Sequence, residues 1–303
     1  MRVLTEDGIP LHVEVDDLAG APVTVVFSHG FTAQLGEFEL QRATLAGRAR
    51  VVLYDQRGHG RSGRAGWRGA SIDQLGRDLQ AVLDATTPTG PVVLFGHSMG
   101  GMALMSWARQ HPAEVGARVA GAFLLATAAG ELVSTGPLAA GVRLLTRLHL
   151  LTAYFAWLRL IAPLLERLRK PGTRLGRAYI RHYLFGTQDA GDPALVTRVQ
   201  AMLEATPLTT SAAFYPTFIS HDERDSLAVL GRIPTTVLCG TADRLTPVSH
   251  SRAMAAALGE SAELVEVPGA GHSVNITCRQ VVDDALLRLL DRAVPQRHGS
   301  ATG

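Results

Sequence analysis

Short apolar runs alternate with longer helical patterns along most of the chain, and this alternation constrains the fold more than any other feature. The apolar runs lie at residues 24–28, 51–55, 92–95, 121–126, 235–240 and 262–267. The helical patterns lie between and after them, at residues 37–45, 71–86, 98–110, 247–258 and 279–292. Strands that are apolar throughout are buried on both faces, so the pattern predicts an α/β fold with a mostly parallel sheet covered by helices on both faces. Two further runs, 3–5 and 11–15, flank a Glu6-Asp7-Gly8 turn and predict an antiparallel hairpin at the sheet edge.

One long segment interrupts the alternation. Residues 131–226 contain no strand pattern, and their helical patterns lie at 138–151, 154–169, 176–185, 193–205 and 211–220. We interpret this segment as a helical cap, or lid, inserted between two parts of one core domain, 1–130 and 227–294. Residues 295–303 are predicted to form a disordered tail.

Composition excludes several classes of protein. The 303 residues are 47% hydrophobic with a net charge of +2, which excludes a disordered chain and disfavours a nucleic-acid binder. Two cysteines are too few for a disulfide scaffold or a Cys₄ zinc site. Glu6 and Asp7 stand where a signal peptide needs its apolar region, and the apolar stretch 144–165 is broken by Arg147, Arg159 and Pro163. We therefore expect a cytoplasmic protein.

A serine at a predicted strand-to-helix turn is the candidate nucleophile. The apolar run at 92–95 continues into Gly96-His97-Ser98-Met99-Gly100-Gly101, which is G-x-S-x-G followed by a helical pattern. Such a sharp turn strains the serine backbone and exposes its hydroxyl above the sheet, and only glycine fits the close approaches on either side. In this context a structural Gly/Ser turn without catalysis is the weaker interpretation.

A serine hydroxyl needs a base to become a nucleophile, and the base needs an orienting carboxylate. His272 lies in the glycine-rich loop Gly269-Ala270-Gly271-His272-Ser273 after the last predicted strand. Asp243 follows the preceding strand, and Ser98, Asp243, His272 is the chain order that accompanies G-x-S-x-G. Glu131 is the reserve carboxylate, since a turn or capping role for Asp243 stays open.

Backbone amides should hold the oxyanion of the tetrahedral intermediate. The Met99 amide directly follows the nucleophile, and the Phe31 amide lies in the turn after the run at 24–28. Gly30 lets that turn approach the site closely. We expect Gly30, His97, Trp157 and Phe214 to line the substrate pocket.

Five motifs together resemble those of the α/β-hydrolase superfamily, in order and in spacing. They are His29-Gly30-Phe31, Asp55-Gln56-Arg57-Gly58-His59-Gly60-Arg61-Ser62, the turn at 96–101, Gly240-Thr241-Ala242-Asp243 and Gly269-Ala270-Gly271-His272. The turn around Ser98 is similar to that of serine esterases and monoacylglycerol-lipase-like members, and it does not fit epoxide hydrolases or haloalkane dehalogenases, whose nucleophile is aspartate. The resemblance also implies that the loop at 55–62 is structural and that His59 is not catalytic.

The expected function is a serine hydrolase that cleaves a carboxylic ester with an apolar acyl or alcohol part, without a metal or organic cofactor. C–C bond hydrolases, thioesterases, acyltransferases and perhydrolases use the same three residue types. A ligand receptor with a hydrolase-like pocket and slow turnover also stays open. The expected partner is a small ester or lipid-like substrate, not a nucleic acid, and the sequence does not reveal the oligomeric state.

The predicted cap carries an uneven share of the charge. Residues 131–181 contain eight arginines and Lys170 against two glutamates, a net charge of +7, so the rest of the chain carries −5. The simpler interpretation is that the apolar stripe of the cap packs on the sheet domain and the arginines form a solvated face. The alternative is that the cationic, apolar helices make peripheral contact with anionic lipid.

Overall fold

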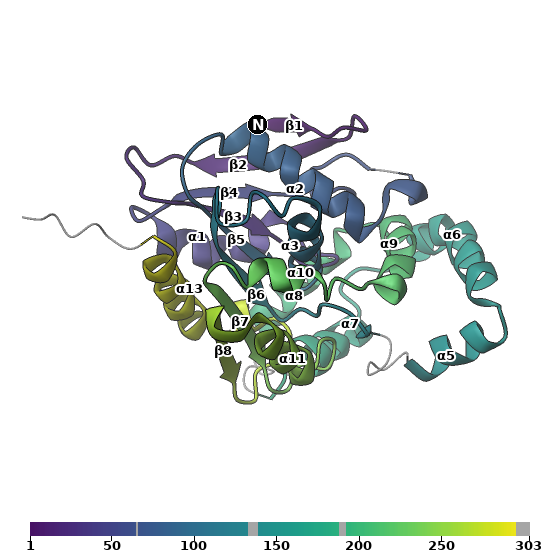
Figure 1. The fold of residues 1–303 in the computed structure, drawn as a ribbon. Coiled ribbons are helices and arrows are strands. Elements are labelled where there is room, and N and C mark those ends of the chain that lie inside the picture. The colour runs from purple at the N-terminus through teal and green to yellow at the C-terminus, as the bar shows by residue number, and fades with distance from the viewer. Residues whose placement is uncertain (65, 133–138, 188–191, 295–303) are drawn as a thin grey trace, which may run out of the picture.

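An eight-stranded sheet forms the centre of the molecule in this computed structural model, which describes residues 1–64, 66–132, 139–187 and 192–294 (Figure 1). Only β1 with β2 and β2 with β4 pair in antiparallel fashion, and the other strand pairs of the described sheet are parallel. The structure thus confirms the predicted mostly parallel sheet with an antiparallel edge. In spatial order the strands are β1 (Arg2–Leu4), β2 (Pro10–Asp16), β4 (Arg50–Tyr54), β3 (Thr24–Ser28), β5 (Val92–His97), β6 (Val119–Leu125), β7 (Thr235–Gly240) and β8 (Ala262–Val267).

Helices cover both faces of this sheet, because successive side chains of each buried strand point to opposite faces. In β3, for example, Val26 packs in one core cluster, whereas Val25 and Phe27 pack in the other. The first cluster is closed by α2 (Ile72–Thr86), α3 (Met99–Gln110), α10 (Ser226–Leu230) and α11 (Val248–Leu258). The second is closed by α1 (Glu39–Leu45) with the 3₁₀ turn η1 (Leu35–Phe38), α12 (Val274–Thr277) and α13 (Arg279–Ala293).

Local signals and core packing explain these elements. The Ser71 hydroxyl accepts a hydrogen bond from the Gln74 amide at 3.1 Å and so caps α2. In the core, the Phe95 ring stacks on Phe123 with ring centroids 4.4 Å apart. Burying each such ring stabilises the fold by about 2 kcal/mol.

The loop between β4 and α2 is held by a buried arginine. Arg57 donates to Asp78 at 2.6 Å and to Asp7 at 2.8 Å, and its side chain is wholly buried. At the start of this loop Asp55 accepts from the Leu35 and Arg61 amides, each at 2.8 Å. The loop therefore ties the hairpin, the sheet and η1 together.

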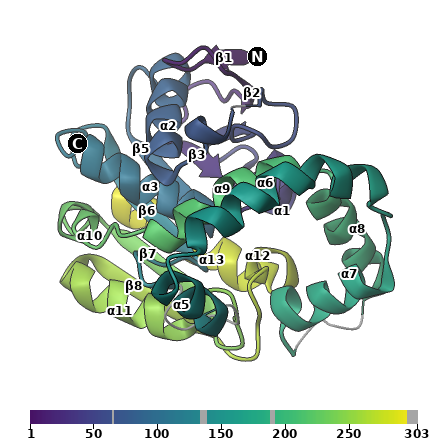
Figure 2. The ribbon, with the colours of Figure 1, turned by 90° about the vertical axis from the view of Figure 1, so that its right-hand side faces the viewer.

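The helices of the predicted cap lie between β6 and α10 in the chain, on one side of the molecule (Figure 2). They are α5 (Ala139–Arg147), α6 (Leu151–Leu168), α7 (Arg174–Tyr179), the π-helical turn η3 (Ile180–Phe185), α8 (Pro193–Glu204) and α9 (Leu208–Ser220). The sequence predicts one helix over 138–151, but the chain turns at His149 with φ of 55° and α6 starts at Leu151. Among the described helices, none is both long and apolar enough to cross a membrane. The predicted tail lies outside the described residues.

Candidate active site

Ser98 occupies the turn between β5 and α3 in a strained backbone conformation. Its φ is 51° and its ψ is −117°, a region that non-glycine residues rarely adopt. Two long-range hydrogen bonds hold the turn in place: the Ser98 amide donates to the Leu125 carbonyl at 2.9 Å, and the Thr127 hydroxyl donates to the Ser98 carbonyl at 2.7 Å. The neighbouring strand β6 and the loop after it thus support the turn that the sequence predicts.

The glycines on either side of Ser98 have no room for a side chain. A Cβ on Gly96 would lie 2.6 Å from the Gly100 carbonyl oxygen, and a Cβ on Gly100 would overlap the Ser28 carbonyl. The G-x-S-x-G spacing is therefore a steric requirement of the turn. It also places Ser98 at the N-terminus of α3, where the helix dipole favours negative charge.

His272 and Asp243 come together at the carboxyl ends of β8 and β7. The Nδ1 atom of His272 lies 2.8 Å from Oδ2 of Asp243, and both side chains are buried. The Asp243 carboxylate also accepts from the Leu245 amide at 2.8 Å, the Thr246 amide at 3.0 Å and the Thr246 hydroxyl at 2.7 Å. Asp243 therefore fills the turn role that the sequence left open and contacts the histidine as well.

Glu131, the reserve carboxylate, has a different partner. Its Oε1 atom lies 2.9 Å from the Arg224 guanidinium, and both side chains are exposed. Of the two carboxylates that the sequence predicts as partners of the histidine, Asp243 is the one that contacts His272.

The backbone amides expected to hold an oxyanion come from two segments, and a Cβ on Gly30 in the first of them would lie 3.5 Å from the Cβ of Ser98. Residues 29–32, here called the oxyanion loop, follow β3, and Met99 opens α3. Within the described part of the chain, neither the Phe31 amide nor the Met99 amide has a hydrogen-bond acceptor. Two side chains position the loop, because Glu37 accepts from the Gly30 amide at 2.9 Å and His59 accepts from the Thr32 amide at 3.2 Å.

A buried ion pair that sequence reasoning missed lies behind the oxyanion loop. Oε1 of Glu37 is 2.7 Å from Nδ1 of His97, although off the ideal hydrogen-bond direction, and Nε2 of His97 lies 3.1 Å from the His272 carbonyl oxygen. Burial by itself would lower the pKa of His97, but the adjacent Glu37 carboxylate outweighs burial and raises that pKa above its ordinary value. Burial would likewise raise the pKa of Glu37, and His97 brings it below its ordinary value. Both ring nitrogens of His97 therefore face oxygen atoms, and the neighbouring Glu37 favours the protonated form of the ring.

The other two buried histidines near the site are neutral. Burial lowers the pKa of His59 to about 3, and burial also lowers the pKa of His29. Nδ1 of His59 lies 3.0 Å from the Arg57 carbonyl, so it carries the proton and leaves Nε2 to accept from Thr32. His59 thus positions the oxyanion loop, and it is not among the described residues that line the cavity beside Ser98.

A cavity of about 660 Å³ opens beside Ser98 between the core and the cap. Gly30, Phe31, Ser98 and His272 line it from the core, together with the predicted pocket residue His97. Most of its apolar lining comes from cap residues, which include Leu145, Tyr154, Phe155, Leu158, Leu184, Leu203, Tyr215, Phe218 and Ile219.

The structure does not place the other two predicted pocket residues at this cavity. Trp157 is 53% exposed on the other side of α6, because Phe155 and Leu158 form the side of that helix that lines the cavity. Phe214 is buried in a core cluster with Met102, and its ring packs against Phe31 with centroids 6.5 Å apart.

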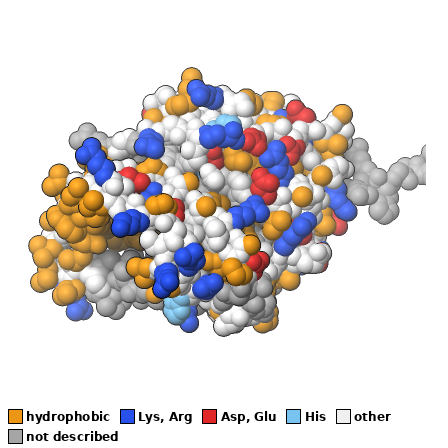
Figure 3. Space-filling model, turned by 180° about the vertical axis from the view of Figure 1, so that it is seen from behind, with side chains coloured by type: hydrophobic (Ala, Val, Ile, Leu, Met, Phe, Trp, Pro, Cys, Tyr) orange, Lys and Arg blue, Asp and Glu red, His pale blue; other side chains and the backbone are white. Residues whose placement is uncertain are grey.

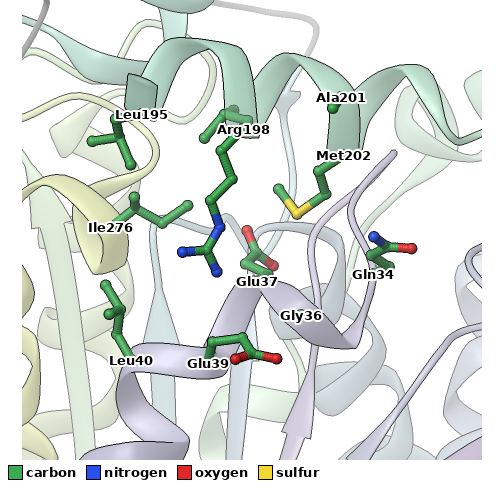
Figure 4. Close-up of a pocket in the computed structure, with 11 residues that line it drawn as sticks. Gln34, Gly36, Glu37, Glu39, Leu40, Leu195, Arg198, Ala201, Met202 and Ile276 are labelled. Carbon is green, nitrogen blue, oxygen red and sulfur yellow. The ribbon is translucent and has the colours of Figure 1, made fainter. Parts of the chain in front are cut away.

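A side cavity of about 290 Å³ adjoins the large one between α8 and η1 (Figure 4). Glu37 and Met202 line both cavities. Figure 4 shows the Arg198 side chain reaching from α8 toward Glu37 and Glu39. Among the described residues, no group of three or more His, Cys, Asp or Glu side chains is arranged to hold a metal ion.

The cap also contacts the His272 loop directly through main-chain hydrogen bonds. The Ser273 amide donates to the Leu184 carbonyl at 2.8 Å, and the Gly271 amide donates to the Phe185 carbonyl at 3.2 Å. The segment that includes η3 therefore supports the loop that carries His272. No side-chain motif signals this contact, so sequence reasoning could not find it.

The fold and the motif geometry agree with a family assignment. A family model described as "alpha/beta hydrolase fold" matches residues 23–277. The chain therefore belongs to the α/β-hydrolase family, as the five motifs predict.

Several proteins of similar sequence or structure have been described, and esterases are among them. The chain is 28% identical over 279 residues to a dihydrolipoyllysine-residue acetyltransferase component of an acetoin cleaving system from Pseudomonas putida, but this match covers 91% of the chain and only 65% of that protein. It is 23% identical to the bifunctional esterase/perhydrolase DCH of Acinetobacter calcoaceticus over 95% of the chain and 98% of that protein. Its structure is similar to that of a thermophilic esterase from Thermogutta terrifontis, with a TM-score of 0.75, 25% identity and coverage of 97% and 98% of the two chains. The chain is thus a hydrolase-family protein with esterase-like relatives.

Proposed function

We propose that this protein is a carboxylic ester hydrolase in which Ser98, His272 and Asp243 form the catalytic triad. The observation that carries the proposal is the 2.8 Å contact of His272 with Asp243 at the wall of the cavity that Ser98 also lines. The strained turn at Ser98 supports it, since such strain is concentrated at functional sites.

The contact with Asp243 indicates which ring nitrogen of His272 carries the proton. A proton on Nδ1 is held by the Asp243 carboxylate, so Nε2 carries the lone pair and is the basic atom. Nε2 removes the Ser98 hydroxyl proton as Oγ attacks the ester carbonyl. The Phe31 and Met99 amides donate to the oxyanion that forms. Nε2–H then protonates the departing alkoxide, and the acyl group stays on Ser98.

Deacylation repeats these steps with water. Nε2 takes a proton from water, the hydroxide adds to the acyl carbon, and the second intermediate collapses with return of the proton to Ser98. The acid product leaves, and the enzyme returns to its starting state. Apart from water and the ester, these steps use only the side chains and amides named above.

The lining of the large cavity supports a substrate with an apolar part. Cap side chains such as Phe155, Leu158 and Phe218 offer no charge to a ligand, and a cavity of about 660 Å³ is of the size that takes small organic molecules. The proposed substrate is therefore a small ester or lipid-like molecule whose acyl or alcohol part is apolar.

A chain-length series of p-nitrophenyl esters tests the proposal. We expect an initial burst of p-nitrophenol followed by steady turnover, with kcat/KM rising with acyl length until the cavity is filled. Ser98→Ala should abolish both hydrolysis and labelling by a fluorophosphonate probe, whereas the exposed Ser220→Ala on α9 should keep both. Binding of the esters without turnover would support a ligand receptor instead, and labelling of Ser98→Ala would overturn the role of Ser98.

A perhydrolase is the second candidate, favoured by the esterase/perhydrolase relative that aligns over 95% of the chain. In this reaction hydrogen peroxide replaces water in deacylation, and a peracid leaves instead of an acid. Peracid formed from a short-chain ester and hydrogen peroxide, and lost in Ser98→Ala, would establish it. Ester hydrolysis without detectable peracid would leave the esterase alone.

A further inference from the structure

The outward side of α6 is apolar and uncovered. The structure describes all of α6, and only Phe155 and Ala162 of this helix are buried. Four exposed residues form what is here called the outer face of α6: Trp157 (53% exposed), Leu160 (78%), Leu164 (58%) and Leu168 (66%). They follow helical spacing and form one stripe about 16 Å long. The structure therefore does not support packing of this stripe on the sheet domain.

Further leucines of the cap are exposed. Leu148 and Leu150 precede α6, and Leu175 lies on α7. Figure 3 shows hydrophobic side chains gathered at the end of the molecule that carries the cap, on the left of that view. Isolated exposed leucines are ordinary on a soluble protein, but a contiguous group of this kind marks an interaction surface.

Cationic side chains accompany this surface. Within the described ranges, five exposed cationic residues of the cap have no carboxylate partner, namely Arg147, Arg167, Lys170, Arg174 and Arg181. Glu166, the one acidic residue between 132 and 187, is already paired with Arg169 at 2.8 Å. Figure 3 also shows Lys and Arg side chains at the border of the hydrophobic group.

This combination of groups indicates the chemistry of the partner. Leucine and tryptophan side chains enter the boundary between lipid headgroups and acyl chains, and arginine and lysine bind anionic headgroups. A second copy of the chain fits less well, because a symmetric dimer through the outer face of α6 would bring one cationic border against the other.

The inner side of the same helix lines the large cavity. Phe155 and Leu158 line the cavity from α6, and Leu145 lines it from α5. One helix thus separates the cavity from the uncovered apolar surface.

We propose that the outer face of α6 docks on the surface of an anionic phospholipid bilayer, with α6 lying in the plane of the interface. The inference goes beyond the proposed function and does not depend on it, because docking needs no turnover.

Vesicle co-sedimentation of the full chain carrying Ser98→Ala tests the proposal. The probes are vesicles of phosphatidylcholine alone and vesicles in which phosphatidylglycerol is the minor component. We expect binding to the mixed vesicles, at least about tenfold weaker binding to phosphatidylcholine alone, and weaker binding with added salt. Ester hydrolysis by the unsubstituted chain is measured separately, so failure of docking and failure of the esterase are distinguishable.

Matched variants locate the surface. Leu160→Glu with Leu164→Glu should weaken binding to the mixed vesicles at least about tenfold, and so should Arg167→Gln with Lys170→Gln. Leu4→Glu is the control, since Leu4 is 69% exposed on β1, away from the cap (Figure 1). All these side chains are exposed, and unchanged thermal unfolding midpoints would verify that the variants fold.

Several results would overturn the proposal. Equal binding to both kinds of vesicle is one, and equal binding by the cap variants and Leu4→Glu is another. Failure to bind the mixed vesicles would overturn it as well. If the chain then sediments as a dimer, and Leu160→Glu with Leu164→Glu gives a monomer, a second copy covers the outer face of α6 instead.

Discussion

Oε1 of Glu37 lies 2.7 Å from Nδ1 of His97, and this buried pair joins the oxyanion loop to the backbone of His272. Oε2 of Glu37 accepts from the Gly30 amide, and Nε2 of His97 lies 3.1 Å from the His272 carbonyl oxygen. The same ion pair therefore contacts the loop proposed to stabilise the oxyanion and the backbone of the histidine proposed to remove the Ser98 proton.

Glu37→Gln should change how stability depends on pH. The folded-state pKa of His97 is raised, so the stability from its protonation is fully present below about 6.5 and is lost as pH rises through the folded pKa. The pKa of Glu37 is lowered, so its contribution is present above about 4.5 and is lost as pH falls through the folded pKa. We expect Glu37→Gln to lower the free energy of unfolding near pH 6 by about 3 kcal/mol and to flatten its decline above about pH 6.5.

Urea unfolding at a series of pH values measures both effects. Glu39→Gln is the control, because Glu39 is an exposed carboxylate two residues further along the chain. Parallel pH profiles for Glu37→Gln and the unsubstituted protein would show that the pair does not titrate as its geometry indicates.

Asp243→Asn should separate binding from chemistry. The asparagine keeps the size of the side chain but removes the charge that holds the proton on Nδ1 of His272, so we expect kcat to fall by about 10³ to 10⁴ with little change in KM. Steady-state hydrolysis of a p-nitrophenyl ester measures this. Glu131→Gln removes the reserve carboxylate, and it should retain nearly full activity. The reverse result would give the orienting role to Glu131.

Gly30→Ala should damage the oxyanion loop. The added Cβ would lie 2.9 Å from Nδ1 of His97, so either the loop or the Glu37–His97 pair must move. We expect kcat to fall by about 10²-fold or more, the effect of losing one oxyanion donor. Gly36→Ala is the matched control, because an added Cβ there meets nothing within 4 Å, and its kinetics should stay close to those of the unsubstituted protein. Equal activity of the two variants would contradict the proposed role of the loop.

Gly186→Ala should test the contact between the cap and the His272 loop. Gly186 has a φ of 72°, and an added Cβ would lie 2.6 Å from the Gly269 carbonyl oxygen and 2.6 Å from the Gly271 amide nitrogen. We expect kcat to fall at least about tenfold as the loop shifts, since small misplacements of catalytic groups are costly. Gly172→Ala has a similar φ of 71° but open space around the Cβ, so it should lose only about 1 kcal/mol of stability and keep its kcat. Similar kcat values for the two variants would show that the contact does not position His272.

The parts of the structure that follow local rules could be predicted from the sequence. Apolar runs and glycine spacing locate the strands and the turn at Ser98, and the positions of Asp243 and His272 after successive strands predict their meeting, because carboxyl ends of parallel strands share one edge. The Glu37–His97 pair could not be predicted, since it joins residues far apart in sequence and Glu37 looks like an ordinary residue at a helix start. Trp157 lies on the opposite side of α6 from the predicted one because that helix is apolar on both sides, so periodicity does not determine which side faces the cavity.

Because the contact between η3 and the His272 loop uses main-chain atoms, it does not depend on the side chains by which α5, α6 and α9 line the cavity. Mutations that reshape the cavity wall can therefore accumulate in α5, α6 and α9 while His272 keeps its support. A chain built in this way can exchange one substrate preference for another without rebuilding the proposed catalytic centre, which is an advantage for directed evolution of new specificities on this scaffold.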